Sequence, residues 1–487
     1  MLNLRIGSRI KDWTIEKKLY SISLVFLSIF FIVPNNKILL LITSILLICL
    51  YLVFKNLTRT CLYAYMLMLP FQNGKGMEFL VVPSEYVYGD VPFIMTPTIT
   101  MSFLIAALLY YGRIRHVSQA RLSELHTTFG TTDVLLGIFF VSGIFSSYIS
   151  EMPVLSFILA IQIWGYILVY YYIIQCRLQS TVREFLLPIL SSLVLYEGFW
   201  SALQYLNKGT LGTWAENSID PSLSATITHV ASEDISFARM QGTFSHPNFL
   251  GYFMAFTLPL LLYASLSKRS SIFMQYTSAV GVVAGIIGLG LSASRASWIV
   301  AAISLIIVFG RSDIRKSLHV TLIIRRFYLG FALLCSLVFP FIIIPRLSQL
   351  AITFNSSGGA IFRWELIGYS IRILLQHPFG VGLGMFPKIL LQDIGGFTSF
   401  PTQPHNLFAQ IFSAFGYLGG ISFMTFLYIK LRSALATIYT SRVSGIDIYQ
   451  YIYRSMFLVF LLLSMFYPIL TEQQLFGWFW ILLTIII

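Results

Sequence analysis

The chain has 487 residues, of which 57% are hydrophobic and only 10% are charged, and its mean hydropathy is +0.80. Soluble domains carry about 25% charged residues, so this composition excludes an ordinary soluble protein. The net charge is +13, but the basic residues gather in short loops between apolar segments, which indicates membrane topology rather than a nucleic-acid partner.

Apolar segments long enough to cross roughly 30 Å of hydrocarbon follow one another along the chain, and their pattern favours helices. We predict about fourteen spans, at residues 19–34, 37–54, 60–72, 93–111, 131–149, 153–175, 184–206, 247–266, 272–291, 295–310, 327–345, 404–430, 450–467 and 474–487. The sequence therefore predicts an all-α polytopic membrane protein, a bundle of about 12–14 transmembrane helices.

Alternate threading from a cytoplasmic N-terminus places most of the lysines and arginines on the cytoplasmic side, together with the C-terminus. Two external loops, 207–246 and 346–403, are too long to be simple turns. They divide the chain into N-terminal helices (1–206), central helices (247–345) and C-terminal helices (404–487).

The second external loop is predicted to contain an amphipathic helix from about residue 360 to 376, stopped by Pro378. Arg363 lies in its first turn, where free backbone N–H groups and the helix dipole also favour anions. Arg372 lies about 180° round the same helix, so the two cannot face one ligand. Arg363 is the favoured candidate, and a surface charge paired with a loop carboxylate is the alternative.

Other arginines are predicted on the same outer side. Guanidinium groups bind phosphate oxygens through paired hydrogen bonds, so such a set suits a pyrophosphate at the membrane surface. Arg295, in "GLGLSASRASW", is placed in a tight turn between two spans, where a charge needs water, headgroups or a ligand. An arginine that reaches to the interface is the alternative. The remaining members of the set are Arg239 and Arg346.

Two histidines begin spans on that side: His246 in "FSHPNF" and His405 in "QPHNLF". The positive end of a helix dipole favours the neutral imidazole, which can accept a proton. Either histidine could act as a base, and a capping or interfacial role is the alternative for both.

Several other features carry less weight. Glu197, inside a span, could be functional or a hydrogen-bonded structural residue. The glycine-rich runs 281–290 and 379–386 lack the strand-to-helix context of a nucleotide site, and Gly281 and Gly285 suit close helix packing. The cysteines form no zinc or disulfide pattern, and no metal or ATP motif is present. No metal and no cofactor is expected.

Four segments in order over about residues 240–420 resemble the signature of the O-antigen ligase and polymerase superfamily: "QGTFSHPNFLGYFMAF", "LSASRASW", "FRWELIGYSIRILLQHPFGVGLGMF" and "PHNLFAQIFSAFGYLGG". The resemblance implies a GT-C-like helical bundle at the cytoplasmic membrane, which transfers a glycan from an undecaprenyl-pyrophosphate donor to an acceptor hydroxyl on the external face. By motif, His405 would be the base or would orient the acceptor, and Arg295 and Arg363 would bind the pyrophosphate. The residues implied to shape the site are His246, Asn248 and Asn406.

Within this superfamily we favour a polymerase of a surface polysaccharide such as teichuronic acid. A ligase that transfers glycan to a lipid core or protein is the alternative. A transporter or flippase of lipid-linked saccharides is the alternative of another class, but it would place charges within spans, where the sequence offers almost only Glu197. The expected partners are the donor, the acceptor and membrane lipids, with a flippase and chain-length proteins as candidates.

Overall fold

The computed structural model describes residues 15–29, 36–70, 130–211, 230–232, 235–237, 239–318, 322–333, 360–394, 403–440, 448–470 and 473–486. Within these residues, six helices are long and apolar enough to cross a membrane. They are Thr131–Tyr148, Pro153–Gln175, Gln179–Leu206, Pro247–Leu266, Ile272–Ser292 and the first 27 residues of a helix that begins at Leu407. The chain is an all-α polytopic membrane protein, as its composition predicts.

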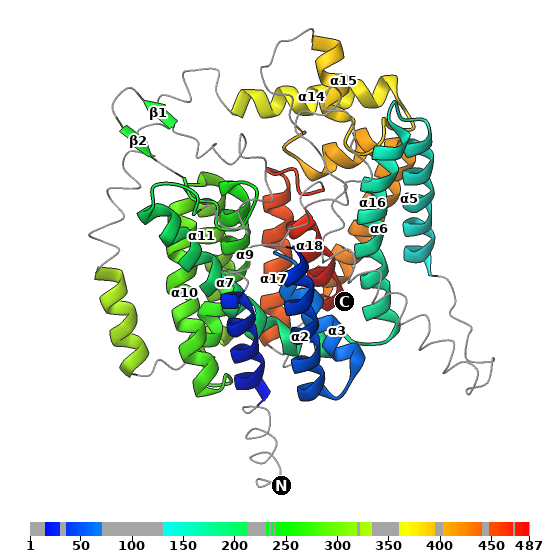
Figure 1. Ribbon diagram of the computed structural model, residues 1–487. Helices are drawn as coiled ribbons and strands as arrows, with labels where there is room; N and C mark the ends of the chain where they lie inside the picture. The colour runs from blue at the N-terminus through cyan, green and yellow to red at the C-terminus, as the bar shows by residue number, and fades with distance from the viewer. Residues whose placement is uncertain are drawn as a thin grey trace, which may run out of the picture. The chain divides into compact units, whose positions relative to one another are not determined.

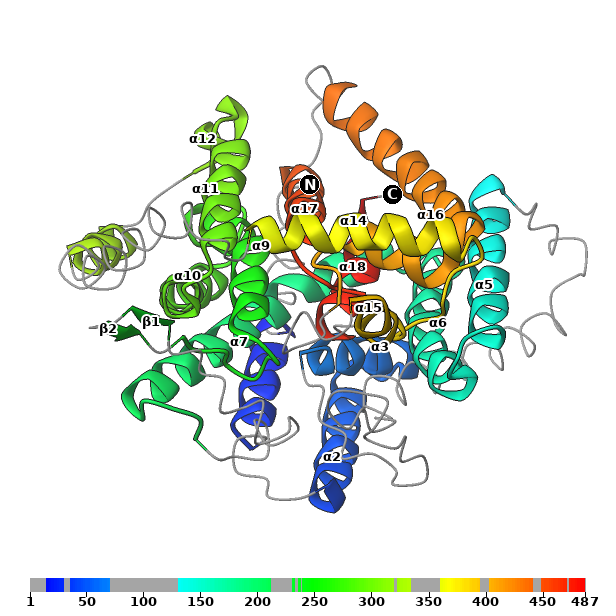
Figure 2. The ribbon, with the colours of Figure 1, turned by 90° about the horizontal axis from the view of Figure 1, so that it is seen from above.

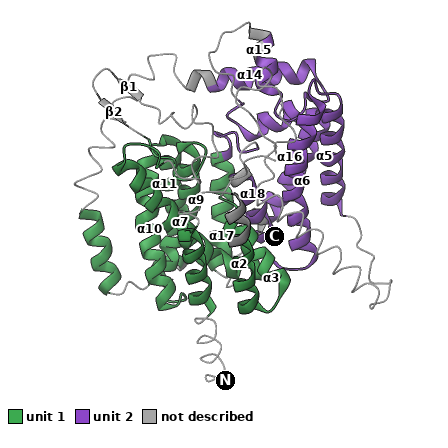
Figure 3. Cartoon of the chain, in the orientation of Figure 1, with its two compact units in different colours: residues 1–73, 179–355, 447–463 green, residues 74–178, 356–446, 464–487 purple. Residues whose placement is uncertain are grey.

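The chain forms two compact units from segments that alternate along the sequence (Figure 3). Unit 1 contains residues 1–73, 179–355 and 447–463, and unit 2 contains residues 74–178, 356–446 and 464–487.

Unit 1 is built on a group of closely packed helices. Helix α10 contacts both α7 and α9, and α9 contacts α11 (Figure 1). Its labelled helices are α2 (Asn36–Phe54), α3 (Leu57–Met68), α7 (Gln179–Leu206), α9 (Pro247–Leu266), α10 (Ile272–Ser292), α11 (Arg295–Phe309), α12 (Ser312–Ser317) and α17 (Ile448–Ser464). Residues 15–29 and 322–333 are also helical.

Glycines allow the unit 1 helices to approach one another. A Cβ atom on Gly285 of α10 would lie 2.9 Å from Leu258 of α9, and one on Gly198 of α7 would overlap the backbone of Ala284. The predicted packing role of this glycine-rich run is confirmed, because residues 281–290 lie inside a continuous helix and not in a phosphate-binding loop.

A short antiparallel ribbon in the first long loop was not predicted. Strands β1 (Val230–Ser232) and β2 (Ile235–Phe237) pair with Ala231 opposite Ser236. Three-residue strands give too short a pattern of alternation to be recognised in a sequence.

Unit 2 combines long helices with a helix that runs across them. Figures 1 and 2 show α14, in yellow, lying crosswise to α5 and α6. The labelled helices of this unit are α5 (Thr131–Tyr148), α6 (Pro153–Gln175), α14 (Ala360–Gln376), α15 (Phe386–Ile394), α16 (Leu407–Thr440) and α18 (Gln473–Ile485).

Helix α14 has the boundaries that its sequence pattern predicts. Its apolar residues Leu366, Tyr369 and Ile373 recur at helical spacing and pack against Val381 and Phe386, which lie in the following loop and in α15. The amphipathic helix is therefore held on one side by the segment that follows it.

Helix α16 is broken at Gly416, whose backbone has φ 70° and ψ −168°. The loop after α14 enters this break, where a Cβ atom on either Gly380 or Gly416 would overlap the backbone of the other segment. The two backbones are joined by hydrogen bonds from Val381 N to Ser413 O (3.0 Å), from Gly382 N to Ala414 O (3.0 Å) and from Tyr417 N to Pro378 O (2.9 Å). The glycines of the 379–386 run thus serve a backbone contact that fastens the end of α14 to α16.

Replacing Gly416 with alanine is expected to destabilise the protein. The backbone conformation at this position is restricted almost entirely to glycine, and forcing another residue into it costs about 1–3 kcal/mol before the overlap with Phe379 is counted. The measurement is the thermal unfolding midpoint of the purified protein in detergent. Gly368→Ala is the matched control, because the space around Gly368 in α14 is open and alanine there favours the helix by about 0.5–1 kcal/mol. Equal midpoints for the two variants would contradict the role given to the break.

Most predicted spans coincide with helices of the structure, and the predicted and observed boundaries differ at the helix ends. The helix predicted over 60–72 begins at Leu57 and ends at Met68, and its 12 residues reach only about 18 Å. Residues 322–333 are helical and overlap the start of the predicted span 327–345, of which residues 334–345 lie outside the described residues. The span 93–111 and Arg346 lie outside the described residues.

Candidate active site

In unit 1, the segment that begins at Arg239 is fastened to the end of α10. The Arg239 side chain is 8% exposed, and its Nε donates to Ser292 O (3.0 Å) while its Nη2 donates to Asn248 Oδ1 (2.5 Å). Met240 N donates to Leu291 O at 3.0 Å. Arg239 therefore links the signature segment around Asn248 with the segment that leads to Arg295, and these hydrogen bonds give it a structural role.

Two polar side chains of α7 hold the next part of this segment. Glu197 is fully buried and accepts hydrogen bonds from the Thr243 backbone N (2.9 Å) and from the Thr243 hydroxyl. Gln204 donates to Gly242 O (2.8 Å) and accepts from Gly242 N (2.9 Å). Of the two roles considered for Glu197, the structure supports the hydrogen-bonded structural role.

His246 is the N-cap of α9. Its Nδ1 accepts a hydrogen bond from Asn248 N at 3.0 Å, and Pro247 is the first residue of the helix. The structure thus favours the capping role for His246, because its Nδ1 already accepts a hydrogen bond from the backbone of α9. His246 and Asn248 shape the start of α9.

Arg295 is the first residue of α11 and follows a tight turn. Ala293 adopts the left-handed conformation, with φ 47° and ψ 32°, and the Ser294 and Ser297 hydroxyls lie 2.9 Å apart. The predicted turn between two spans is confirmed. Among the described residues, the Arg295 guanidinium makes no hydrogen bond or ion pair.

In unit 2, α14 and α16 contact each other and place Arg363 near His405. Arg363 lies in the first turn of α14, and His405 lies two residues before the start of α16. In the described part of the chain, no acid forms an ion pair with Arg363, and its positive charge acts on the histidine.

The surroundings of His405 keep its ring neutral. Burial, and then the charge of Arg363, lower the pKa of His405 from 6.5 to about 4. Its Nδ1 is buried and has no hydrogen-bond partner among the described residues. A buried ring nitrogen without a partner costs free energy, so a ligand that supplies the missing hydrogen bond would be favoured here.

The neighbours of this pair have other roles. Asn406 Oδ1 accepts from Phe408 N (2.9 Å) and Ala409 N (3.1 Å), which caps α16, and its Nδ2 donates to Met465 O (3.1 Å). Arg372 is exposed, and its guanidinium lies over the Tyr369 ring at 5.4 Å.

The lowered pKa of His405 predicts how activity depends on pH. Because the ring stays neutral down to about pH 4, kcat/KM for a reaction in which His405 is the base should stay level between about pH 5 and 8 and fall by half near pH 4. Removing the charge in Arg363→Gln should move this fall to higher pH, towards the ordinary histidine value, whereas Arg363→Lys should leave it in place. A wild-type profile that falls near pH 6.5 would contradict the neutral, buried ring.

The predicted site residues thus fall into two groups. His246, Asn248 and Arg295 belong to unit 1, where Arg239 connects the segments that carry them. Arg363, His405 and Asn406 belong to unit 2, where the charge of Arg363 acts on His405. Sequence reasoning missed the break at Gly416, although the glycines on both of its sides were visible.

The described helices define a polytopic membrane protein. Residues 280–424 match the family described as O-Antigen ligase, which supports the resemblance of this part of the chain to the O-antigen ligase and polymerase superfamily. The match includes Arg295, Arg363 and His405. No curated protein matches the chain. The domain supports a function of the O-antigen ligase or polymerase type in polysaccharide assembly.

Proposed function

We propose that the protein is a polymerase of a bacterial surface polysaccharide, which transfers a glycan from undecaprenyl pyrophosphate to a hydroxyl of an acceptor sugar at the external face of the cytoplasmic membrane. The observation that carries the proposal is the Arg363–His405 pair. It sets a guanidinium without an acidic partner in the described residues beside a neutral histidine whose Nδ1 lacks a hydrogen bond.

The proposed reaction gives each member of this pair one task. The acceptor oxygen attacks the anomeric carbon of the donor and forms the new glycosidic bond, while His405 takes the hydroxyl proton. The bond from the anomeric carbon to the pyrophosphate oxygen breaks, and its electron pair leaves with undecaprenyl pyrophosphate. Attack opposite the leaving group inverts the anomeric configuration.

Arg363 would bind the leaving pyrophosphate. A fixed guanidinium near developing negative charge stabilises a transition state without reorganisation, and the first turn of α14 adds the positive end of the helix dipole. The bound pyrophosphate would offset the positive charge that lowers the pKa of His405, so donor binding would make the histidine a stronger base. Arg295 is a second proposed phosphate ligand, since it also lies at the start of a helix and its guanidinium has no partner among the described residues.

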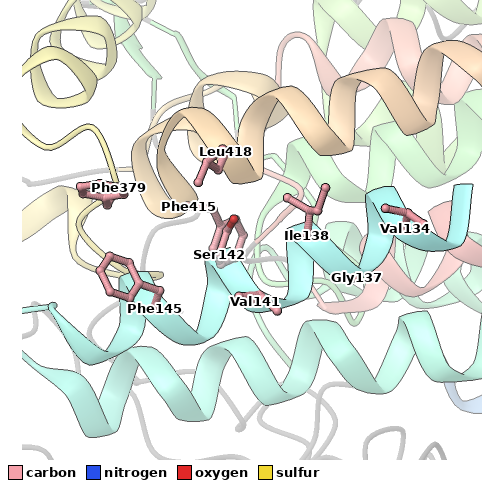
Figure 4. Close-up of a pocket in the computed structure, with 9 residues that line it drawn as sticks. All are labelled: Val134, Gly137, Ile138, Val141, Ser142, Phe145, Phe379, Phe415 and Leu418. Carbon is pink, nitrogen blue, oxygen red and sulfur yellow. The ribbon is translucent and has the colours of Figure 1, made fainter. Parts of the chain in front are cut away.

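An apolar groove in unit 2 supports a lipid-linked donor. Its volume is about 540 Å³, and it lies between α5 and α16, with Phe379 of the loop after α14 at one end (Figure 4). The labelled side chains are apolar except for Ser142, which suits an isoprenoid chain. Phe379 follows the C-terminal end of α14, whereas Arg363 lies in the first turn, about 20 Å away along the helix, so the groove would hold a distal part of the isoprenoid chain.

The size of the glycan that accumulates in cells lacking activity tests the proposal. A defective polymerase should leave single repeat units on undecaprenyl pyrophosphate in the outer leaflet. Long lipid-linked chains would instead identify a ligase, and repeat units held in the inner leaflet would identify a flippase. Either of the last two results would overturn the polymerase assignment.

A further inference from the structure

Basic side chains from three helices of unit 1 gather away from the segment that carries His246. Arg59 in the first turn of α3 forms an ion pair with Glu184 of α7, and its guanidinium lies over the Phe185 ring at 5.7 Å. Tyr453 of α17 donates to Arg183 O of α7 at 3.3 Å. The N-terminal parts of α3, α7 and α17 therefore meet.

Arg454 of α17 is the buried member of this cluster, which consists of Arg59, Arg183 and Arg454. Its side chain is 6% exposed, and its Nε and one terminal nitrogen are buried without a hydrogen-bond partner among the described residues. The charge that acts on it is that of Arg183, which is repulsive. Arg454 is thus a charge within the predicted span 450–467, where the sequence indicates almost no charge besides Glu197.

A buried guanidinium depends on an anionic partner more than a buried lysine or histidine does. Arginine does not lose its proton in proteins, so it cannot become neutral as a buried lysine or histidine can. An unpaired charge at this depth is costly, and the acid that the structure places in the cluster, Glu184, is paired with Arg59. Two nitrogens of the Arg454 guanidinium therefore lack a negative partner among the described residues.

We propose that this cluster is a binding site for an anionic phosphate group, supplied by the headgroup of an anionic phospholipid. Guanidinium donors match phosphate oxygens, and basic pockets between transmembrane helices bind such headgroups. The site is separate from the segment fastened at Glu197, because Glu197 lies fourteen positions after Arg183 in α7, which is about 21 Å along a helix. By the charge pattern of the loops, it lies at the predicted cytoplasmic end of unit 1.

The test compares lipids bound to the purified full-length protein in detergent by native mass spectrometry. Dioleoyl phosphatidylglycerol should bind at least about tenfold more tightly than dioleoyl phosphatidylcholine, because a charge-assisted hydrogen bond contributes that much. Arg454→Gln should abolish this preference. Arg315→Gln, which changes an exposed arginine of α12 on the same predicted side, should keep it.

A second measurement does not depend on a variant that must fold. Inorganic phosphate should displace phosphatidylglycerol from the wild-type protein, whereas potassium chloride at the same ionic strength should not. Thermal stabilisation by inorganic phosphate without a lipid preference would support the phosphate site but assign it to a free anion. Equal binding of both lipids together with no effect of phosphate would overturn the proposal, as would a preference retained in a folded Arg454→Gln protein.

Discussion

Replacing His405 with alanine is expected to reduce polymer formation by about 10²–10⁴-fold, the usual contribution of a general base. The protein should remain in the membrane, since Nδ1 of the ring makes no hydrogen bond to the described residues. The alanine also removes a buried polar atom without a partner, so no loss of stability is expected from that atom. Polymer per unit of membrane protein, measured by glycan sizing and quantitative immunoblotting, gives the result.

A second histidine in the same unit provides the control for this prediction. His377 lies just after α14 and is exposed, so His377→Ala should keep activity close to that of the wild type. His405→Gln should be as inactive as His405→Ala, because an amide can accept a hydrogen bond but cannot take up the proton. Substantial activity in His405→Gln would show that the residue orients the acceptor and is not the base.

Replacing Arg363 with alanine should lower kcat by about 10²–10³-fold, as the loss of one electrostatic contact to a transition state does elsewhere. Arg363→Lys should retain part of the activity, because it keeps the charge but loses the paired donors that match a phosphate. The measurement is single-turnover transfer from a lipid-linked donor, which separates chemistry from donor binding.

The same helix offers a matched control for Arg363. Arg372 is exposed and its guanidinium lies over the Tyr369 ring, so Arg372→Ala should alter transfer less than about twofold. If both alanine variants lost activity equally, the effect would come from the charge of α14 as a whole and not from a phosphate contact. A change in KM alone for Arg363→Ala would limit its role to donor binding.

Helix α14 was predictable because its signals are local. The glycines before it, the helical spacing of its apolar residues and Pro378 after it all point to the same boundaries, and the structure has them at Ala360 and Gln376. The prediction that Arg363 lies in the first turn of this helix is therefore confirmed. A residue whose position depends on its own helix can be located from the sequence when the helix carries its own start and stop signals.

The break in α16 was not predictable, because its cause lies elsewhere in the chain. Gly416 stands in an apolar run that is typical of close helix packing, and only the approach of Pro378 and Gly380 makes the broken backbone stable. Backbone groups freed inside a membrane-spanning helix must find partners, and here they belong to a loop distant in sequence. The sequence shows where the glycines are, but it does not show that the backbones at Gly380 and Gly416 contact each other.

The contacts of the arginines predicted on the outer side also could not be predicted from the sequence. Arg239 and Arg295 have equal standing in the sequence, since both are cations beside a span on the predicted outer side. The structure separates them, because Arg239 is held by Ser292 and Asn248 while Arg295 makes no contact of this kind in the described residues. For the same reason the sequence allows both a functional and a structural role for Glu197. Its hydrogen bonds from Thr243 favour the structural role.

The most direct test of the proposed glycosyl transfer uses purified protein in lipid vesicles with a synthetic undecaprenyl-pyrophosphate repeat unit as its only substrate. Without a nucleotide sugar, and with a metal chelator present, wild-type protein should form lipid-linked chains of two and more repeats and release undecaprenyl pyrophosphate. Arg363→Ala and His405→Ala should form neither product, and Arg372→Ala should form both. Chains that appear only when a nucleotide sugar is supplied, or equally with His405→Ala, would contradict transfer by these residues from a polyprenyl donor.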